Sequence, residues 1–217
     1  MLGMSTPKHM NLHAHQILCG ATWVNSKAHG KNTMLMGSSG RISTTCRMTP
    51  ASRFSPQFYQ ELKNAVANCL RLSSVGDCSA NTRGPIRDWN VSAITNMHKM
   101  FFYALVFNTD ISRWDVSAVT DMSEMFCNAK EFNKDISKWD VSAVIDMSAM
   151  LAHAAAFNVD ISKWNVSAVI DMNGMFYEAD SFNVDISNWD VSAVTDMTNM
   201  FVKSLSFDQV LHVGILG

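Results

Sequence analysis

Residues 114–138 read Trp114-Asp-Val-Ser-Ala-Val-Thr-Asp-Met-Ser-Glu-Met-Phe-Cys-Asn-Ala-Lys-Glu-Phe-Asn-Lys-Asp-Ile-Ser-Lys138, and Trp139 then begins nearly the same sequence again. A tryptophan opens each 25-residue unit, at Trp89, Trp114, Trp139, Trp164 and Trp189. Self-similarity at a fixed period of this size is typical of a solenoid, in which each turn buries its apolar side by stacking on its neighbours. The sequence therefore predicts a repeat solenoid of nearly five turns over residues 89–211, followed by a tail over 212–217.

Two kinds of apolar spacing follow each other within a turn. We interpret residues 119–122 as a short strand. Apolar residues at steps of three, one, three and three then predict a helix from about Ser123 to Ala129, and these residues are Met122, Met125, Phe126, Ala129 and Phe132. Asp121 is the expected N-cap of this helix. We therefore expect an α/β repeat solenoid of the leucine-rich-repeat type, with one short parallel strand and one short helix per turn.

A cap is expected before the first turn, because the end of a solenoid otherwise leaves its apolar face exposed. Apolar residues recur at intervals of three and four from Phe58 onward, which predicts an amphipathic helix. Residues 56–88 are therefore interpreted as an N-terminal helical cap and lead-in. Cys69 and Cys78 lie in this segment and form a disulfide if the protein is secreted, or stay reduced if it is cytosolic.

Residues 1–55 are a separate extension without acidic side chains. A basic, hydroxyl-rich and acid-free composition is typical of an organelle transit peptide. The apolar stretch 17–24 is alternatively a short signal-peptide core, and a disordered extension is the third interpretation. His9, His13 and His15 do not have the spacing of a known metal site.

The charge distribution excludes some partners. All 19 acidic residues lie at or after Glu61, although the formal net charge of the chain is only −2. Because nucleic-acid recognition requires clustered Lys and Arg, we expect no nucleic-acid partner for the repeats. No apolar run approaches the roughly 18 residues of a membrane-spanning helix, so we expect no transmembrane segment.

Most of the recurring residues are interpreted as structural. Stacked aromatic side chains can bind sugars or bases, but an aromatic at the same place in every turn packs on its neighbours and buries a large apolar area. We therefore assign the tryptophans to the core. The asparagines that follow the Phe of each turn are expected to form an amide ladder that bonds to the backbone, and they are Asn108, Asn133, Asn158 and Asn183.

Aspartates are the candidates for metal binding. One ladder comprises Asp110, Asp135, Asp160 and Asp185. A second comprises Asp115, Asp140 and Asp190, with Asn90 and Asn165 in the other two turns. Like charges stacked about 4.8 Å apart repel one another unless they face water or share a cation. Calcium is the candidate cofactor because it prefers carboxylate oxygens, and turn-forming side chains in contact with water are the alternative.

Catalysis has no recognisable set of residues in the sequence. His98 and His153 occupy different places in their turns, and no Ser/His/Asp or HExxH-like constellation is visible. We therefore expect a protein without enzymatic activity and assign no catalytic residue. Asn90-Val-Ser and Asn165-Val-Ser match the acceptor sequence for N-glycosylation, and both arise where Asn replaces the Asp of the repeat.

The repeated unit W-[DN]-V-S-A-[VI]-[TI]-[DN]-M-x-x-M-[FL]-x-x-A-x-x-F-N-x-D-I-S-x resembles the bacterial surface protein 26-residue repeat. That family is also described as a mycoplasma lipoprotein domain of unknown function and is related to BspA-like leucine-rich repeats. The resemblance covers about Arg87 to Phe207. It implies a secreted or cell-surface protein that binds protein or extracellular-matrix partners. Organelle targeting by the acid-free N-terminus is the alternative location.

Binding specificity requires exposed residues that differ between turns. One place in the repeat meets this requirement, and its residues are Glu124, Ala149, Gly174 and Asn199. We expect these residues to form the binding surface of a non-enzymatic module for protein–protein interaction or adhesion. The alternative is a structural or calcium-binding repeat that uses the aspartate ladders.

Overall fold

The computed structural model describes residues 53–79 and 82–210. The described residues all belong to one compact unit of the chain. The predictions for the extension before residue 53 and for the tail at 212–217 fall outside the described residues. In the described part of the chain, no helix has both the length and the apolar character needed to span a membrane.

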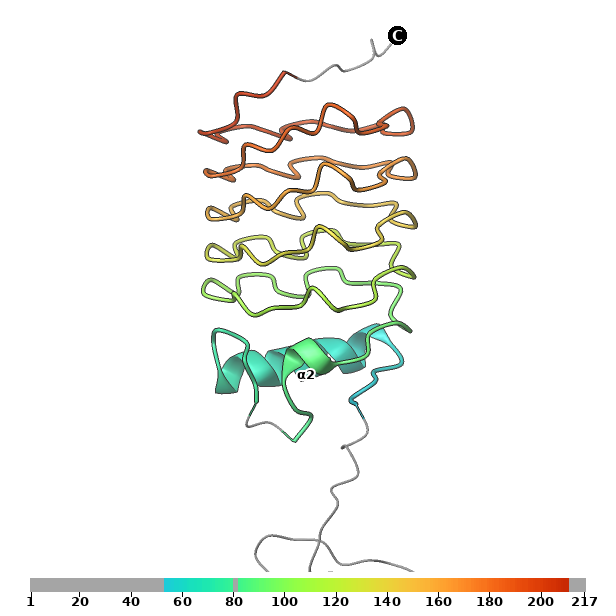
Figure 1. Cartoon of the computed structure of the whole chain (residues 1–217), viewed down its shortest axis with the longest axis vertical. Coiled ribbons are helices and arrows are strands. Elements are labelled where there is room, and N and C mark those ends of the chain that lie inside the picture. The colour runs from blue at the N-terminus through green and yellow to red at the C-terminus, as the bar shows by residue number, and fades with distance from the viewer. Residues whose placement is uncertain (1–52, 80–81, 211–217) are drawn as a thin grey trace, which may run out of the picture. The chain divides into compact units, whose positions relative to one another are not determined.

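The repeats form coils that stack one on another (Figure 1). We number the coils from their tryptophans, so that coil 1 is 89–113, coil 2 is 114–138, coil 3 is 139–163, coil 4 is 164–188 and coil 5 begins at 189. Parallel backbone bridges join the same place in successive coils, through Asn96, Asp121, Asp146, Asp171 and Asp196. The sequence period is therefore also the spatial period of the stack.

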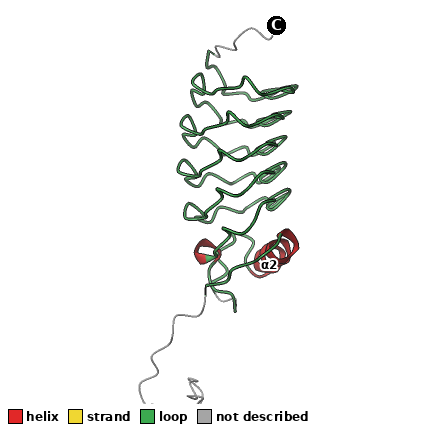
Figure 2. Cartoon of the chain, turned by 90° about the vertical axis from the view of Figure 1, so that its right-hand side faces the viewer, coloured by secondary structure: helices red, strands yellow, loops and turns green. Residues whose placement is uncertain are grey.

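The prediction of an α/β solenoid of the leucine-rich-repeat type is wrong. In the described residues, the named elements are the helix α2 (Tyr59–Leu72) and the short 3-10 helix η1 (Ile86–Asp88). Adjacent coils are joined by isolated bridges, and the described part of Figure 2 contains no strand. Neither the strand expected at 119–122 nor the helix expected from Ser123 to Ala129 is formed.

The segment expected to be helical is a series of tight turns. Within coil 2, alternate N–H groups donate to the carbonyl three residues earlier, and the N–H groups between them donate to coil 3. The bonds to coil 3 run from Glu124 to Ser148 (2.8 Å), from Phe126 to Met150 (2.9 Å) and from Asn128 to Ala152 (2.8 Å). Each coil thus satisfies half of these N–H groups internally and needs the next coil for the rest.

Left-handed backbone prevents a helix from continuing through this segment. Glu124 and Asn128 have φ values of 52° and 62°, and the equivalent residues of every other coil also have positive φ. These residues are Lys99 and Tyr103, Ala149 and His153, Gly174 and Glu178, and Asn199 and Lys203. A side chain in this conformation crowds its own backbone and costs roughly 1–2 kcal/mol, a cost that glycine avoids. Only coil 4 has a glycine here, Gly174.

The hydrogen bonds between coils give the stack a direction. In the turn segment, N–H groups face the following coil and carbonyls face the preceding one, as in the bond from the Lys99 N–H to the Ser123 carbonyl (3.0 Å). Coil 1 has no preceding coil to donate to its carbonyls. The helix α2 takes that place at His98, because the Tyr59 hydroxyl donates to the His98 carbonyl (3.0 Å). The Lys63 ammonium also donates to coil 1, at the Lys99 carbonyl.

The core consists of side-chain columns that continue through the coils. The five tryptophans that open the coils are between 2% and 7% exposed, as expected for core residues. Their indole N–H groups also reach backbone carbonyls, as in the bond from Trp139 to Ile111 (3.3 Å). Phe107, Phe132 and Phe157 stack with ring centroids 5.8 Å and 6.1 Å apart. Burial of these aromatic faces stabilises the stack.

Asparagine side chains add a further connection between coils. The Asn108 side-chain oxygen accepts a hydrogen bond from the backbone N–H of Asn133 (3.1 Å), and Asn133 does the same for Asn158 (3.0 Å). Asn158 in turn accepts from the N–H of Asn183 (2.9 Å). This is the amide ladder expected from the sequence, and it satisfies backbone donors where the chain bends.

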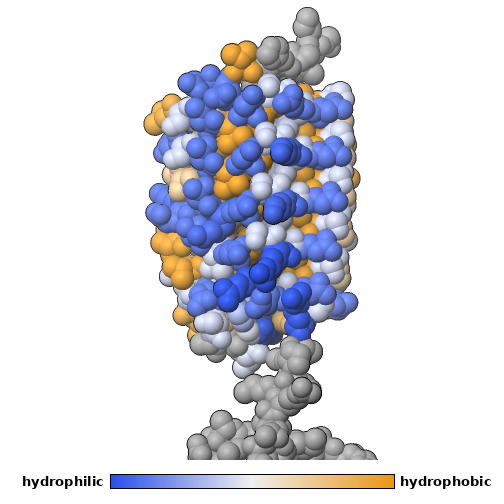
Figure 3. Space-filling model, in the orientation of Figure 1, coloured by the Kyte–Doolittle hydropathy of each residue, from blue (hydrophilic) through white to orange (hydrophobic). Residues whose placement is uncertain are grey.

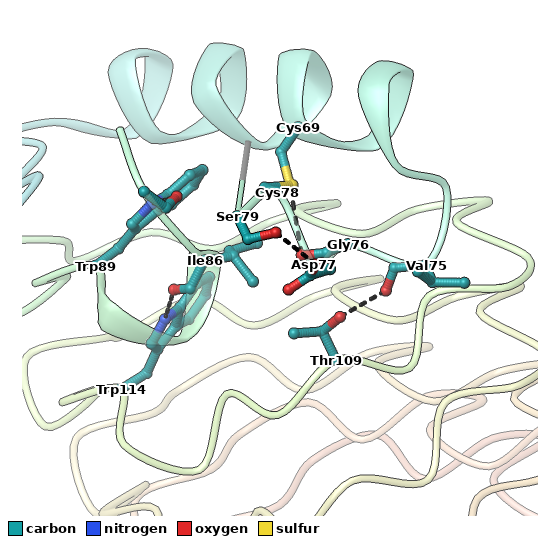
Figure 4. Close-up of a disulfide and its surroundings, with 11 residues drawn as sticks. Cys69, Val75, Gly76, Asp77, Cys78, Ser79, Ile86, Trp89, Thr109 and Trp114 are labelled. Atoms are coloured by element: carbon teal, nitrogen blue, oxygen red, sulfur yellow. Dashed lines mark hydrogen bonds between the residues drawn. A yellow bond between two sulfur atoms is a disulfide. The ribbon is translucent and has the colours of Figure 1, made fainter. Parts of the chain in front are cut away.

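A disulfide joins the end of α2 to the lead-in of the first coil (Figure 4). Cys69 and Cys78 are bonded, and their Cα atoms are 5.4 Å apart. Between them, Gly76 has φ of 90°, and a Cβ at this residue would lie 2.5 Å from the ring of Phe107. The loop therefore packs directly on coil 1 and depends on glycine at this place.

We expect reduction of this disulfide to lower the free energy of unfolding by about 2–3 kcal/mol, because a loop of this size loses its constraint in the unfolded chain. Urea unfolding with and without dithiothreitol measures the effect. The double variant Cys69→Ala/Cys78→Ala should not respond to the reductant, whereas Cys127→Ala should respond as the unaltered chain does. An equal response in all three proteins would show that the disulfide does not stabilise the stack.

Ala149→Gly should stabilise the protein by about 1 kcal/mol, because glycine removes the strain of φ 48°. Ala152→Gly is the matched control, since Ala152 lies three residues later in the same turns without positive φ. We expect this control to destabilise the protein by about 1 kcal/mol through the added freedom of the unfolded chain. Thermal unfolding compares the two, and destabilisation by both would contradict the assigned backbone conformation.

Candidate binding face and the aspartate ladders

Residues at and beside the left-handed backbone positions form three columns across the coils, which we call the turn face. Most of these residues are exposed or half-buried, whereas Cys127, Ala152 and Gly174 are buried. Its first two columns hold Phe102 and Tyr103, Cys127 and Asn128, Ala152 and His153, Tyr177 and Glu178, and Val202 and Lys203. Its third column holds Lys99, Glu124, Ala149, Gly174 and Asn199. The chemistry of these columns changes from coil to coil, whereas the buried columns keep the same or similar residues.

The turn face is aromatic and apolar at coil 1. Phe102 is 37% exposed and Tyr103 is 59% exposed, and their ring centroids are 4.6 Å apart. The Lys99 ammonium lies 5.2 Å from the Phe102 ring centroid and 3.1 Å from the Glu124 carboxylate. Leu105, in the following turn, is also exposed. This part of the face thus combines exposed aromatic surface with one ion pair at its edge.

The turn face is charged across coils 3 to 5. Glu178 contacts His153 Nδ1 at 3.0 Å and the Lys203 ammonium at 2.7 Å. The hydrogen bond from Lys203 holds the pKa of Glu178 below its ordinary value, and the bond to Glu178 raises the pKa of Lys203. The Tyr177 ring contacts His153 edge-on and also faces Lys203. These side chains hold one another in place across three coils.

The expected binding residues form one column, but they do not share one environment. Glu124 and Ala149 are half-buried, Gly174 is buried and Asn199 is exposed. Each has positive φ, and the N–H groups of the first three donate to the next coil. Backbone geometry therefore constrains this column as much as exposure does. The neighbouring column from Tyr103 to Lys203 also carries aromatic and charged groups, of which Tyr103 and Lys203 are exposed.

A histidine, a serine and an aspartate meet between coils 1 and 2. His98 Nδ1 lies 2.7 Å from Ser123 Oγ, and Ser123 donates its hydroxyl proton to Asp121 (2.5 Å). In a catalytic triad the histidine accepts the serine proton, and the aspartate orients the histidine. Here the serine proton is directed to the carboxylate instead. Ser148 makes the same bond to Asp146 without a histidine (2.7 Å), so the contact belongs to the repeat.

Cys127 is a free cysteine within the turn face. Burial raises the pKa of its thiol, although a hydrogen bond from Asn128 acts in the opposite direction. A raised pKa keeps the sulfur protonated, and the thiolate is the reactive form. The residue is therefore a packed side chain and not an activated nucleophile.

The aspartates form local turns in both ladders. Asp110 accepts a hydrogen bond from the backbone N–H of Ser112 (2.9 Å), and Asp135 accepts one from Ser137 (2.9 Å). In the second ladder, the Asp140 oxygen accepts from both the N–H and the hydroxyl of Ser142, at 3.1 Å and 2.6 Å. The Asp-x-Ser pattern thus has a structural reason in each coil, since the side chain replaces a backbone acceptor.

The aspartates expected as calcium ligands accept hydrogen bonds from serine in each of these coils. Asp160 and Asp185 make the same turn as Asp110 and Asp135, to Ser162 and Ser187. Hydrogen bonds from serine, by side chain and then by backbone, hold the pKa of Asp110 below its ordinary value. Within residues 53–79 and 82–210, no three His, Cys, Asp or Glu side chains come together as a metal site requires.

One comparison with known proteins finds a family. A family model described as "Mycoplasma protein of unknown function, DUF285" matches residues 70–179 and 136–213. The matched region begins within α2 and extends through the coils. It agrees with the resemblance to a mycoplasma domain of unknown function. No curated protein and no solved structure matches the chain.

Acid should destabilise the stack through these turns. Hydrogen bonds from Ser142 and Ser192 hold the pKa values of Asp140 and Asp190 below their ordinary value, near 3.9 in an unfolded chain. The resulting stabilisation is complete above that value and is lost as pH falls through the lower pKa of the folded state. We therefore expect the unfolding temperature to fall from about pH 4 downward.

The double variant Asp140→Asn/Asp190→Asn tests the origin of this acid sensitivity. Asparagine keeps the turn, as Asn165 shows in coil 4, but it does not titrate. The variant should therefore lose less thermal stability than the unaltered chain between about pH 6 and pH 3. Circular dichroism melts measure this difference. Equal losses in the two proteins would exclude these carboxylates as the cause.

Proposed function

We propose that this chain, which belongs to the DUF285 family of Mycoplasma proteins of unknown function, is a non-enzymatic protein-binding module that acts in adhesion at a cell surface. The observation that carries the proposal is the contrast between constant buried columns and the variable turn face. Tryptophan and phenylalanine recur inside every coil, whereas the column from Tyr103 to Lys203 has a different residue in each coil. A repeated scaffold with one varied surface is a suitable basis for selective recognition.

The composition of the turn face supports a protein partner. Tyrosine is enriched among the residues that contribute most to protein interfaces, and Phe102 and Tyr103 expose aromatic surface side by side. The network of Glu178 with His153 and Lys203 adds directional polar contacts at the other end. Figure 3 shows apolar patches within a mainly hydrophilic surface on the side of the stack that it presents.

The rigidity of the turn face also favours binding. Its left-handed residues are held by hydrogen bonds to the next coil, as at Glu124 and Ala149. A surface that is already ordered loses little conformational entropy when a partner binds. The varied side chains are therefore presented on a backbone that need not change on association.

The polar contacts and the disulfide support the remaining parts of the proposal. The contact of His98 with Ser123 and Asp121 is arranged as a turn rather than as an activated nucleophile, in keeping with a non-enzymatic role. The bond between Cys69 and Cys78 is typical of proteins that reach an oxidising compartment, in keeping with a cell-surface location.

Binding should be measured with purified chain against a panel of extracellular-matrix proteins and against intact cells. We expect saturable binding, and the double variant Phe102→Ala/Tyr103→Ala should weaken it at least about tenfold because it removes the exposed aromatic surface. Glu178→Ala should have a smaller effect, since it removes polar contacts within the face.

Ile145→Ser is the matched control. Ile145 is 45% exposed, but it does not belong to the turn face. Its backbone N–H donates to the carbonyl of Thr120 in the preceding coil. Its substitution should leave the affinity unchanged. Absence of saturable binding to every probe, or an equal loss in the control, would contradict the proposed function.

A further inference from the structure

We propose that Asn165 is an N-glycosylation site, whereas Asn90, in the same Asn-Val-Ser sequence, is not. Both tripeptides match the acceptor pattern, and both lie at the start of a coil. The sequence alone does not distinguish them. The structure does, because the two amide groups have different surroundings.

The Asn165 side chain is exposed and presents its nitrogen. Its oxygen accepts hydrogen bonds from the backbone N–H of Ser167 (3.2 Å) and from the Ser167 hydroxyl (2.8 Å). Both donors occupy the oxygen side of the planar amide. Within the described residues, the amide nitrogen of Asn165 has no hydrogen-bond partner. The nitrogen that would carry a sugar is therefore the free side of this group.

The Asn90 side chain is half-buried and its nitrogen is already bonded. The amide nitrogen donates to the hydroxyl of Ser55 (3.3 Å), and the backbone N–H of Asn90 donates to the carbonyl of Phe54 (2.8 Å). The Phe54 ring also packs against Trp89 with a centroid distance of 5.0 Å. A sugar on Asn90 would have to fit beside the Ser55 hydroxyl and the packed Phe54 ring.

The modification itself is a group transfer from a lipid-linked oligosaccharide pyrophosphate, which is the co-reactant. The Asn165 nitrogen forms a bond to the anomeric carbon of the first sugar. The bond between that carbon and the pyrophosphate oxygen breaks, and the lipid pyrophosphate leaves with the electron pair. One amide proton is lost from the nitrogen. The chain supplies only an accessible acceptor, and the compartment supplies the donor and the transferase.

The inference rests on the proposed cell-surface function in one respect: the chain must pass through a secretory compartment to meet the transferase. The disulfide between Cys69 and Cys78 is compatible with that oxidising route. The preference for Asn165 over Asn90 depends on local geometry alone. It can be tested independently of any binding partner.

The repeat offers matched controls for the test. Asp140 occupies the same place in coil 3 and makes the same two bonds, to the N–H and hydroxyl of Ser142. Asp140→Asn therefore creates an acceptor sequence in an equivalent exposed turn. Asn165→Asp removes the acceptor and restores the residue that coils 2, 3 and 5 have at this place. Both changes keep the oxygen that accepts the hydrogen bonds.

The full chain should be expressed behind a cleavable signal peptide in eukaryotic cells that perform N-glycosylation, and all of the product should be examined. We expect the unaltered chain to carry one glycan that a peptide amidase removes, with conversion of Asn165 to aspartate in the mass spectrum. Asn165→Asp should carry none, and Asn90→Asp should retain the single glycan. Asp140→Asn should carry two.

Two results would overturn the inference. One is an Asp140→Asn variant that carries a glycan at residue 140 but none at Asn165, which would show that exposure in this turn is insufficient. The other is a glycan on Asn90 in folded chain. A failure of the proposed binding function would be seen in a different measurement, the binding of unglycosylated chain to matrix proteins and cells. It would leave the glycan result unchanged.

Discussion

The hydrogen bonds that run from one coil to the next are the constraint on which the rest of the structure depends. In the turn segment, N–H groups such as that of Glu124 have their acceptors only in the following coil. A single coil would leave these donors, and an apolar column of Trp, Met and Phe, in water. The coils are therefore stable only together. The first one needs α2, because the Tyr59 hydroxyl replaces the donor that a preceding coil would provide to the His98 carbonyl.

The sequence predicts the period, the buried columns and the capping helix, because each depends on apolar spacing or on the exposed end of a repeat. It does not predict the path of the backbone within a coil. The spacing of Met122, Met125, Phe126 and Ala129 suits a helix, but consecutive turns with left-handed residues also direct these side chains inward. Because most coils lack glycine at these places, the conformation leaves little trace in the sequence. Gly174 is the main signal.

The candidate site shows the same limit on inference from the sequence. The aspartate ladders are visible as a pattern, but a carboxylate that binds calcium and one that accepts a backbone N–H can occupy the same repeat position. The structure shows the second of these contacts, since the backbone N–H groups of Ser112 and Ser142 donate to Asp110 and Asp140. Variation in sequence does not report exposure, so it does not by itself distinguish the column of Glu124 from the neighbouring column of Tyr103.

The asparagine and aspartate residues at the start of the coils connect the scaffold to its surface chemistry. The turn needs only one side-chain oxygen as acceptor, and both aspartate and asparagine provide one. Asp140 and Asn165 each use it to accept a hydrogen bond from the hydroxyl of the serine two residues later. The second atom of the side chain, a carboxylate oxygen or an amide nitrogen, has no part in these turn bonds. Charge and acceptor chemistry can therefore change at this place without changing the fold. For the same reason, this column can lose a negative charge and gain an attachment point for a sugar in a single substitution, while the coil beneath it keeps its hydrogen bonds.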